Sequence, residues 1–224
     1  MNRLRVKFSR GEAVKYISHL DTLRTFERAI RRAGIPITHS QGFNPRPQMS
    51  FGLPLSVGVT SVSEFVDLEM DERIAPEKFR EIMNSNMPEG FKIIEAGYID
   101  LKESLMSSIG SASYRVWAAL ESEKTKEELQ KLTDKFLLKD CIIVNKESKG
   151  KIREIDIRAD IFEFRLIDYN QGKLEFSMTL SAGSVSNLKP ELVIKAFNNE
   201  TGLDLGIEKI HRIGLYGQGR KELI

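Results

Sequence analysis

The segment that organises this chain spans residues 16–58 and reads YISHLDTLRTFERAIRRAGIPITHSQGFNPRPQMSFGLPLSVG. No Asp or Glu occurs between Glu27 and Glu64, although 29% of the residues in the chain are charged. The pattern predicts a capped basic helix followed by a loop rich in polar residues, glycine and proline. We therefore interpret the rest of the chain as a scaffold that presents this segment.

The helix is predicted from both of its ends. Ser18 and Asp21 have the S-x-x-D spacing of a capping box, and the helical pattern then continues to Ala33. Gly34 suits the left-handed position that ends many helices. Four arginines cluster on a helical wheel opposite the apolar residues: Arg24, Arg28, Arg31 and Arg32. A solvated face explains this cluster as well as an anion-binding surface does, but the planar guanidinium favours phosphate contact.

The loop motif S-Q-G-F-N-P-R-P occupies residues 40–47. Gly42 permits a positive φ angle, while Pro45 and Pro47 fix their own φ and restrict the residues before them. A loop stiffened in this way presents side chains at low ordering cost, which suits binding. The alternative is a proline-rich crossover that only packs Phe43 and Phe51 into a core.

The candidate site combines the helix and the loop. The residues expected to bind an anion or nucleic acid are Arg24, Arg28, Arg31, Arg32, Ser40, Gln41, Asn44, Arg46 and Ser50, with His39 close in sequence. The residues expected to shape the motif are Ser18, Asp21, Gly42, Phe43, Pro45 and Pro47.

His19 is the one candidate catalytic residue. It falls on the apolar side of the helical wheel, which favours a half-buried histidine near the helix start. As a functional group it could act as a general acid or base, or donate to a phosphate. His19 and His39 lack the spacing of metal ligands and no third ligand is evident, so no metal site is predicted.

The composition of the chain argues against several classes of protein and of site. The single cysteine, Cys141, excludes an internal disulfide and any thiolate metal or iron–sulfur site built by this chain alone, and no cofactor is predicted. No apolar run approaches the roughly 20 residues of a membrane span, and residues 1–10 lack the apolar core of a signal peptide. These features predict a cytoplasmic protein without membrane contact.

The net charge of +2 is unevenly distributed. Residues 1–55 contain ten Lys or Arg and three Asp or Glu, so the remainder of the chain is net acidic. We expect such an asymmetry to steer phosphate-rich partners toward the first quarter of the sequence.

The first hundred residues predict a β-α-β-β-α-β order. Residues 3–8, RLRVKF, alternate as in a half-buried strand. Further strands are expected within 48–58 and over 63–70 and 91–99, and a second helix over 75–87. This order is the split βαβ of ferredoxin-like folds, in which the first and third strands are antiparallel neighbours. Asp67 and Glu69 are then expected to pair with Arg3, Arg5 and Lys7 across the strands.

The second half predicts a similar order after a polar, Ser-rich linker at 100–111. The expected elements are strands at 113–120, 141–146, 152–167, 174–180 and 205–215 and helices at 125–138 and 189–198, with a break in alternation near 159–161. We therefore predict an α+β protein of two tandem ferredoxin-like (βαββαβ) domains with antiparallel sheets. The domains would span 1–100 and 112–224, the second with an extra strand.

Residues 16–70 resemble the radical SAM-linked proteins, an uncharacterised domain found beside, or fused to, radical S-adenosylmethionine enzymes. The resemblance is carried by SHLD at 18–21, RAIRRAGIP at 28–36, SQGFNPRPQMSFGLPLSVG at 40–58 and SEFVDLEM at 63–70. It implies a radical SAM protein as a partner that would supply the iron–sulfur cluster. It implies no particular reaction.

Three functions are consistent with the sequence. The first is a non-catalytic accessory module that binds RNA, either tRNA or rRNA, through the basic helix and loop and serves a radical SAM enzyme in RNA modification. The second is a protein–protein adaptor that docks the radical SAM enzyme through the acid-free segment. The third is a metal-independent RNA-processing enzyme that uses His19, with Arg24 or Arg28 stabilising charge.

Overall fold

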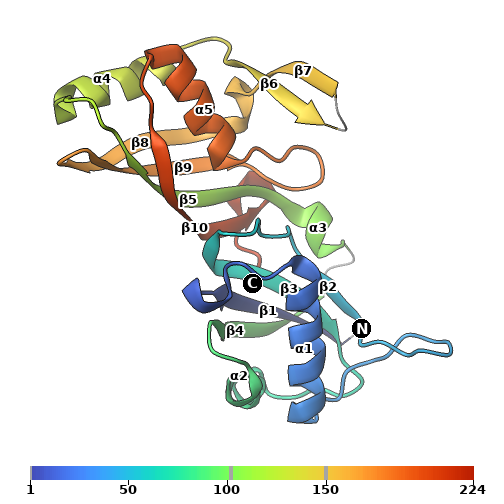
Figure 1. Ribbon diagram of the computed structural model, residues 1–224. Coiled ribbons are helices and arrows are strands. Elements are labelled where there is room, and N and C mark those ends of the chain that lie inside the picture. The colour runs from blue at the N-terminus through green and yellow to red at the C-terminus, as the bar shows by residue number, and fades with distance from the viewer. Residues whose placement is uncertain (1, 101–102, 149–150) are drawn as a thin grey trace. The chain divides into compact units, whose positions relative to one another are not determined.

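A computed structural model describes residues 2–100, 103–148 and 151–224 as a mixed α+β protein. The chain forms two compact units (Figure 1). One unit comprises the residues up to Gly110 together with Leu215–Ile224, and the other comprises Ser111–Gly214. Within the described residues, no helix combines the length and the apolar character needed to cross a membrane.

The first unit is built around strand β1 (Arg3–Arg10). β1 pairs antiparallel with β4 (Phe91–Ile99) on one edge and with β3 (Thr60–Glu69) on the other. The short strand β2 (Met49–Phe51) pairs antiparallel with β3 on the edge away from β1. The predicted antiparallel pairing of the first and third strands is therefore confirmed.

Two helices supply the apolar layer over this sheet. Helices α1 (His19–Ala33) and α2 (Pro76–Asn86) bury Phe26, Ile30, Phe79 and Met83 against the apolar side chains of β1, β3 and β4. The 3₁₀ turn η1 (Glu12–Val14) connects β1 to α1. Each helix thus buries one stripe, as amphipathic helices on a sheet do.

Both predicted ends of α1 are confirmed. The Ser18 hydroxyl accepts a hydrogen bond from the Asp21 backbone N–H at 3.1 Å, which satisfies one of the free donors at the helix start. Gly34 ends the helix with φ of 62°, a left-handed conformation that suits glycine. Local sequence therefore determines where this helix begins and ends.

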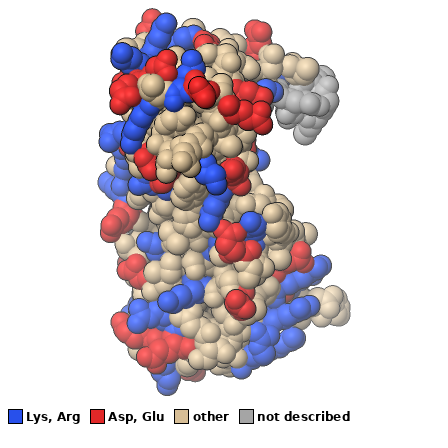
Figure 2. Space-filling view, turned by 60° about the vertical axis from the view of Figure 1, so that its left-hand side comes forward, with Lys and Arg blue, Asp and Glu red and all other residues tan. Residues whose placement is uncertain are grey.

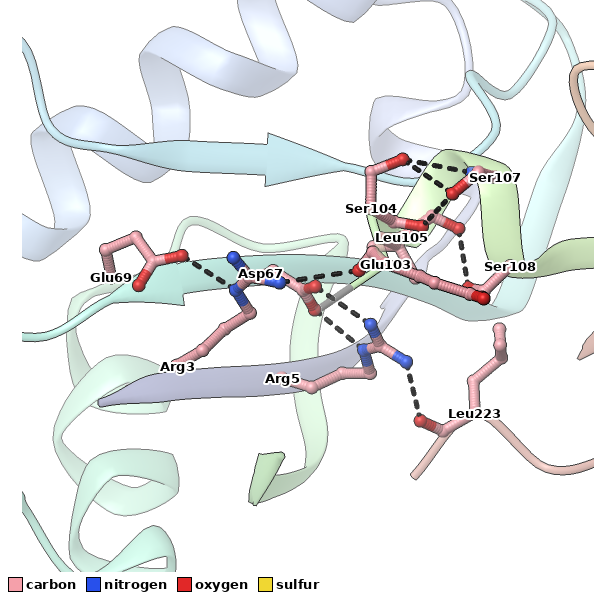
Figure 3. A network of polar contacts seen from close by, with 10 residues as sticks. All are labelled: Arg3, Arg5, Asp67, Glu69, Glu103, Ser104, Leu105, Ser107, Ser108 and Leu223. Carbon is pink, nitrogen blue, oxygen red and sulfur yellow. Dashed lines mark hydrogen bonds and ion pairs between the residues drawn. The ribbon is translucent and has the colours of Figure 1, made fainter. Parts of the chain in front are cut away.

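The sequence predicts a half-buried strand for β1, but the charged side of this strand is covered as well. Arg5 is fully buried and its guanidinium donates to the two carboxylate oxygens of Asp67 at 2.7 and 2.8 Å. The same guanidinium donates to the Leu223 carbonyl at 2.9 Å (Figure 3). Arg3 donates to Glu69 at 2.7 Å. The expected cross-strand pairs Arg3–Glu69 and Arg5–Asp67 are confirmed.

The predicted linker contains regular structure. Residues 101–102 of the expected linker lie outside the described residues. Ser104 caps the short helix α3 (Leu105–Ser108), Leu105 is buried, and strand β5 (Ile109–Ala119) begins directly afterwards. Polar composition was a poor guide here because a side-chain cap and one buried leucine suffice to order the segment.

The second unit contains a sheet in the order β10-β5-β9-β8. Its other strands are β8 (Ile161–Asn170), β9 (Lys173–Ser181) and β10 (Gly206–Gly217), and its helices are α4 (Lys126–Leu137) and α5 (Pro190–Thr201). Phe136, Phe164, Phe176 and Phe197 meet in its core with ring centroids 5.0–6.1 Å apart. These edge and stacked contacts join both helices to the sheet.

The break in alternation near 159–161 separates two strands. Strand β7 (Lys151–Asp156) ends before the 3₁₀ turn η2 (Arg158–Asp160), and β8 follows. β7 pairs with β6 (Ile143–Ser148) as a separate two-stranded sheet. The extra strand expected in this half is thus part of a hairpin outside the main sheet.

The C-terminal boundary differs from the predicted domain 112–224. Leu215–Ile224, which includes the 3₁₀ turn η3 (Gln218–Arg220), belongs to the first unit. The contacts that hold it there include the Arg5 bond to the Leu223 carbonyl and the Leu215 N–H donating to the Ser63 hydroxyl at 3.1 Å. Such contacts between ends of the chain leave no local signal in the sequence.

Candidate nucleic-acid interface

The arginine face of α1 is exposed as predicted. Thr22, Phe26, Ala29 and Ile30 face the core and are buried. The four arginines on the other side are exposed: Arg24, Arg28, Arg31 and Arg32. In Figure 2, Lys and Arg side chains gather at the lower right of the view, whereas the lower left also carries Asp and Glu. The helix therefore presents a basic surface, which we call the arginine face.

The four arginines differ in their partners. Arg24 lies 3.4 Å from the Asp21 carboxylate in an exposed ion pair. Arg32 donates to the carbonyl of Asn86, the last residue of α2, and so joins the two helices. In the part of the chain that the structure describes, Arg28 and Arg31 have no acidic partner. These two are the arginines best placed to bind an external anion.

Asp21 belongs to the helix start rather than to the basic surface. The Ser18 hydroxyl donates to its carboxylate at 2.7 Å, and this hydrogen bond, with help from Arg24, lowers the pKa of Asp21. The carboxylate thus stays charged and complements the partial positive charge of the helix N-terminus.

The loop after α1 forms an irregular hairpin over residues 37–49. Its base is attached to β3, because the Thr38 N–H donates to the Glu69 carbonyl at 2.8 Å and the Glu69 N–H donates to the Gln48 carbonyl at 3.1 Å. Further out, the Ser40 N–H donates to the Arg46 carbonyl at 2.8 Å and the Arg46 N–H donates to the Ser40 hydroxyl at 3.0 Å. In Figure 1 this hairpin projects away from the rest of its unit.

The tip of the hairpin consists of residues 41–45. Gly42 has φ of 125°, a conformation that L side chains rarely adopt, so this position requires glycine. Gln41, Phe43, Asn44 and Arg46 are exposed. The Phe43 side chain is as exposed as in an extended peptide, at 106%.

The exposure of Phe43 contradicts the alternative in which the loop packs both phenylalanines into a core. Phe51, in contrast, does contribute to packing: its ring lies 5.2 Å from that of Phe26 and 6.1 Å from that of Phe8. The difference arises because Phe51 lies on β2 beside the sheet, whereas Phe43 lies at a hairpin tip.

The remaining loop residues are placed as follows. Ser50 is exposed on β2, opposite Asp67 in the strand register. His39 is exposed and bridges to Pro47 across the hairpin, with its ring Nδ1 2.9 Å from the Ile37 carbonyl. Among the described residues, no hydrogen bond or ion pair joins the arginine face to the hairpin tip.

His19 is half-buried, as the helical wheel predicts. Its ring meets Phe51 edge-on at 5.5 Å and lines a cavity of about 20 Å³, enough for roughly one water. Arg10 and Glu64 line the same cavity and are buried. His19 thus packs against an aromatic ring beside a water-sized cavity.

Sequence reasoning missed Arg10. Its guanidinium donates to the carbonyls of Val14, Lys15 and Ile17 and so orders the turn that leads into α1. Burial lowers the pKa of Arg10, and the nearby Glu64 carboxylate opposes this shift. An arginine at the end of an alternating strand gave no signal of this role.

Within the described ranges, no group of three or more His, Cys, Asp or Glu side chains is arranged to hold a metal ion. The arginine face and the tip present guanidinium groups, amides and one aromatic ring.

Several solved structures have a similar fold. A chain in the Cbf5–Nop10–Gar1 complex matches with a TM-score of 0.56 and 11% identity, covering 94% of this chain and 47% of that chain. A chain in an H/ACA RNP bound to a substrate RNA containing 2′-deoxyuridine matches with a TM-score of 0.54 and 8% identity, covering 98% and 49%. The present chain thus spans about half the length of these solved chains, and at such low identity the likeness concerns the fold alone.

The comparison of sequences, unlike that of structures, assigns the chain to a family. No curated protein matches the chain significantly. Residues 3–190 match a family described as "Uncharacterized protein conserved in bacteria (DUF2344)", and this match covers most of the 224 residues, including the arginine face and the hairpin. The chain therefore belongs to this uncharacterised bacterial family.

Proposed function

We propose that this protein is a non-catalytic module that binds RNA, either tRNA or rRNA, through the arginine face and the 37–49 hairpin. The observation that carries the proposal is the exposure of Arg28 and Arg31 without an acidic partner among the described residues. An arginine already engaged in an ion pair would have to break it to bind phosphate. Arg28 and Arg31 are available without that cost.

Two further observations support RNA as the anion. The hairpin that follows α1 exposes amide groups, a guanidinium and an aromatic ring, which together suit nucleotides better than inorganic phosphate. One solved chain of similar fold belongs to an RNP that holds a substrate RNA. The second observation is an analogy of fold and adds weight only beside the first.

We also propose that each unit is a ferredoxin-like domain. In the first unit the strand order is β4-β1-β3-β2, and in the second it is β10-β5-β9-β8. Both orders suit a β-α-β-β-α-β chain if the β6–β7 hairpin is treated as an insertion. This assignment supports RNA binding only by analogy.

The resemblance to radical SAM-linked proteins suggests the partner that the module would serve. The single cysteine of this chain cannot by itself hold an iron–sulfur cluster. We therefore propose that the module presents RNA to a radical SAM enzyme in the cytoplasm.

An adaptor function is the second candidate, and one surface favours it. Tyr16, Leu20 and Val57 are large apolar side chains that are 74%, 63% and 59% exposed around the start of α1. The Gly58 N–H donates to the Lys15 carbonyl at 2.8 Å, which holds the segments of Tyr16 and Val57 together. An exposed apolar patch of this kind suits a protein partner.

The test of RNA binding uses total cellular RNA across a salt series. We expect affinity to fall steeply with salt, and the double variant Arg28→Ala/Arg31→Ala to lower the slope of log K against log salt by about 2, roughly 1 for each phosphate contact. The matched control is Lys131→Ala/Lys135→Ala, which removes two exposed charges from α4. An equal effect of both variants would mean that net charge alone is responsible.

The adaptor alternative predicts a different result. The radical SAM enzyme would then copurify with this protein after ribonuclease treatment, and Leu20→Ser/Val57→Ser would abolish the complex. Absence of RNA binding together with such a complex would replace the RNA proposal with the adaptor.

A further inference from the structure

Phe43 is the most exposed large apolar side chain in the described part of the molecule. Its exposure of 106% means that no neighbouring group covers the ring. Burying a phenylalanine typically stabilises a protein by about 1.5–3 kcal/mol, so folding gains nothing from Phe43 in this position. The ring is thus available for an external contact.

The backbone that presents Phe43 is well held. Ser40 and Arg46 pair across the hairpin just below the tip, and Pro45 and Pro47 restrict the returning arm. Gly42, directly before Phe43, has the positive φ that turns the chain. A ring on such a tip loses little conformational entropy on binding.

The groups around the ring favour a nucleotide over a protein pocket. Gln41 and Asn44 flank Phe43 and expose amides that can pair with base edges, and Arg46 exposes a guanidinium that can pair with phosphate. A protein-binding hot spot is instead usually surrounded by contacts that exclude water. Between Ser40 and Pro47, Phe43 is the one large apolar side chain.

We propose that Phe43 stacks on an unpaired nucleobase of the bound RNA, with Arg46 contacting the adjacent phosphate. This inference rests on the proposed RNA-binding function and adds a substrate class to it: single-stranded loops, bulges or ends. Bases within a duplex are already stacked on one another and do not offer a free face to the tip.

The test compares two probes, a labelled unstructured RNA oligonucleotide and the same strand annealed to its complement. We expect Phe43→Ala to weaken binding of the single strand by about 5- to 150-fold, the range for loss of one stacked base, and to leave duplex binding unchanged. The salt slope should stay at the wild-type value because Phe43 is neutral, in contrast to Arg28→Ala/Arg31→Ala.

Two further variants separate stacking from simple apolar contact. Phe43→Leu keeps an apolar side chain but no ring, and we expect it to behave like Phe43→Ala. Phe43→Trp should retain the wild-type affinity, and its emission should be quenched by the single strand. The wild-type protein, which has Trp117 as its one tryptophan, provides the background signal. Because the ring is exposed, all three variants are expected to fold, and thermal unfolding checks this.

The outcomes distinguish the two proposals. If the wild type binds total RNA steeply with salt but Phe43→Ala binds the single strand as tightly as the wild type does, the stacking inference is wrong and the proposed function stands. The inference would also be wrong if Phe43→Leu bound the single strand as tightly as the wild type does. It would be wrong, too, if the wild type bound total RNA but did not bind the single strand. If the wild type binds no RNA at all, both proposals fail.

Discussion

Arg5 of β1 and the arginines of α1 lie in the same unit but differ in burial and in their partners. Arg5 is fully buried and bonds to Asp67 and to the Leu223 carbonyl. Arg28 and Arg31 are exposed and, within the described residues, have no acidic partner. The difference arises because β3 places acids opposite β1, whereas α1 borders a loop free of Asp and Glu.

This contrast teaches that the role of a basic residue is set by its neighbouring element. A buried guanidinium must be satisfied, and its partners therefore hold elements together. An exposed guanidinium adds little to stability and is free to bind a ligand. Substitutions in the two sets should thus affect different measurements.

The largest expected effect is on stability, at Arg5. Arg5→Ala leaves the Asp67 carboxylate buried without its partner, and breaking such a pair costs about 3–5 kcal/mol. Urea unfolding followed by circular dichroism measures this loss. Arg28→Ala serves as the exposed control and should change the free energy of unfolding by less than about 0.5 kcal/mol.

A double variant sharpens the same test. Arg5→Met/Asp67→Leu removes both charges, so neither is left unpaired, and it should recover most of the lost stability. Equal unfolding midpoints for Arg5→Ala and the wild type would show that the pair does not matter for stability.

The second prediction concerns a variant in which an acidic residue is introduced into the arginine face. Arg24→Glu places a carboxylate one helical turn before Arg28, where the two can pair. RNA affinity should fall about tenfold, or 1.4 kcal/mol, below that of Arg24→Ala, because one further phosphate contact is lost. Filter binding at several salt concentrations measures this, with Arg24→Gln as the uncharged control. Identical curves for the Glu and Ala variants would refute the role of Arg28.

The third prediction concerns the scaffold of the arginine face. Ser18→Ala removes the cap at the start of α1 and should lower the free energy of unfolding by about 1 kcal/mol. Ser18→Asp keeps an acceptor at this position and should lose much less. Thermal unfolding of the three proteins tests this, and a Ser18→Ala protein as stable as the wild type would show that the cap is dispensable.

The smallest expected effect is a pH dependence at Asp21. The hydrogen bond from Ser18 lowers the pKa of Asp21 below its ordinary value of 3.8. The stability that this carboxylate contributes is therefore present above that value and lost as the pH falls through the lowered pKa. The melting temperature of Asp21→Asn should lie below that of the wild type at neutral pH, and the gap should close in acid. A difference in melting temperature that stays constant with pH would show that the charge of Asp21 does not contribute to stability.

Much of the fold could be predicted from local sequence. Alternation in RLRVKF predicts β1, and the Ser18 cap and Gly34 give the bounds of α1 because caps act within one turn. The helical wheel also placed the four arginines opposite the apolar residues of α1, and they are exposed. Cross-strand pairing of Arg5 with Asp67 followed from the expected strand order.

Only the tertiary structure decided which of these groups are buried or exposed. The cover over Arg5 comes from Leu223, which is 218 positions away, and no local pattern encodes so distant a contact. The same holds for the assignment of Leu215–Ile224 to the first unit. Phe43 was consistent with a core residue or a surface residue until the hairpin placed it at a tip. Local interactions determine elements, but burial depends on what the whole chain brings to each face.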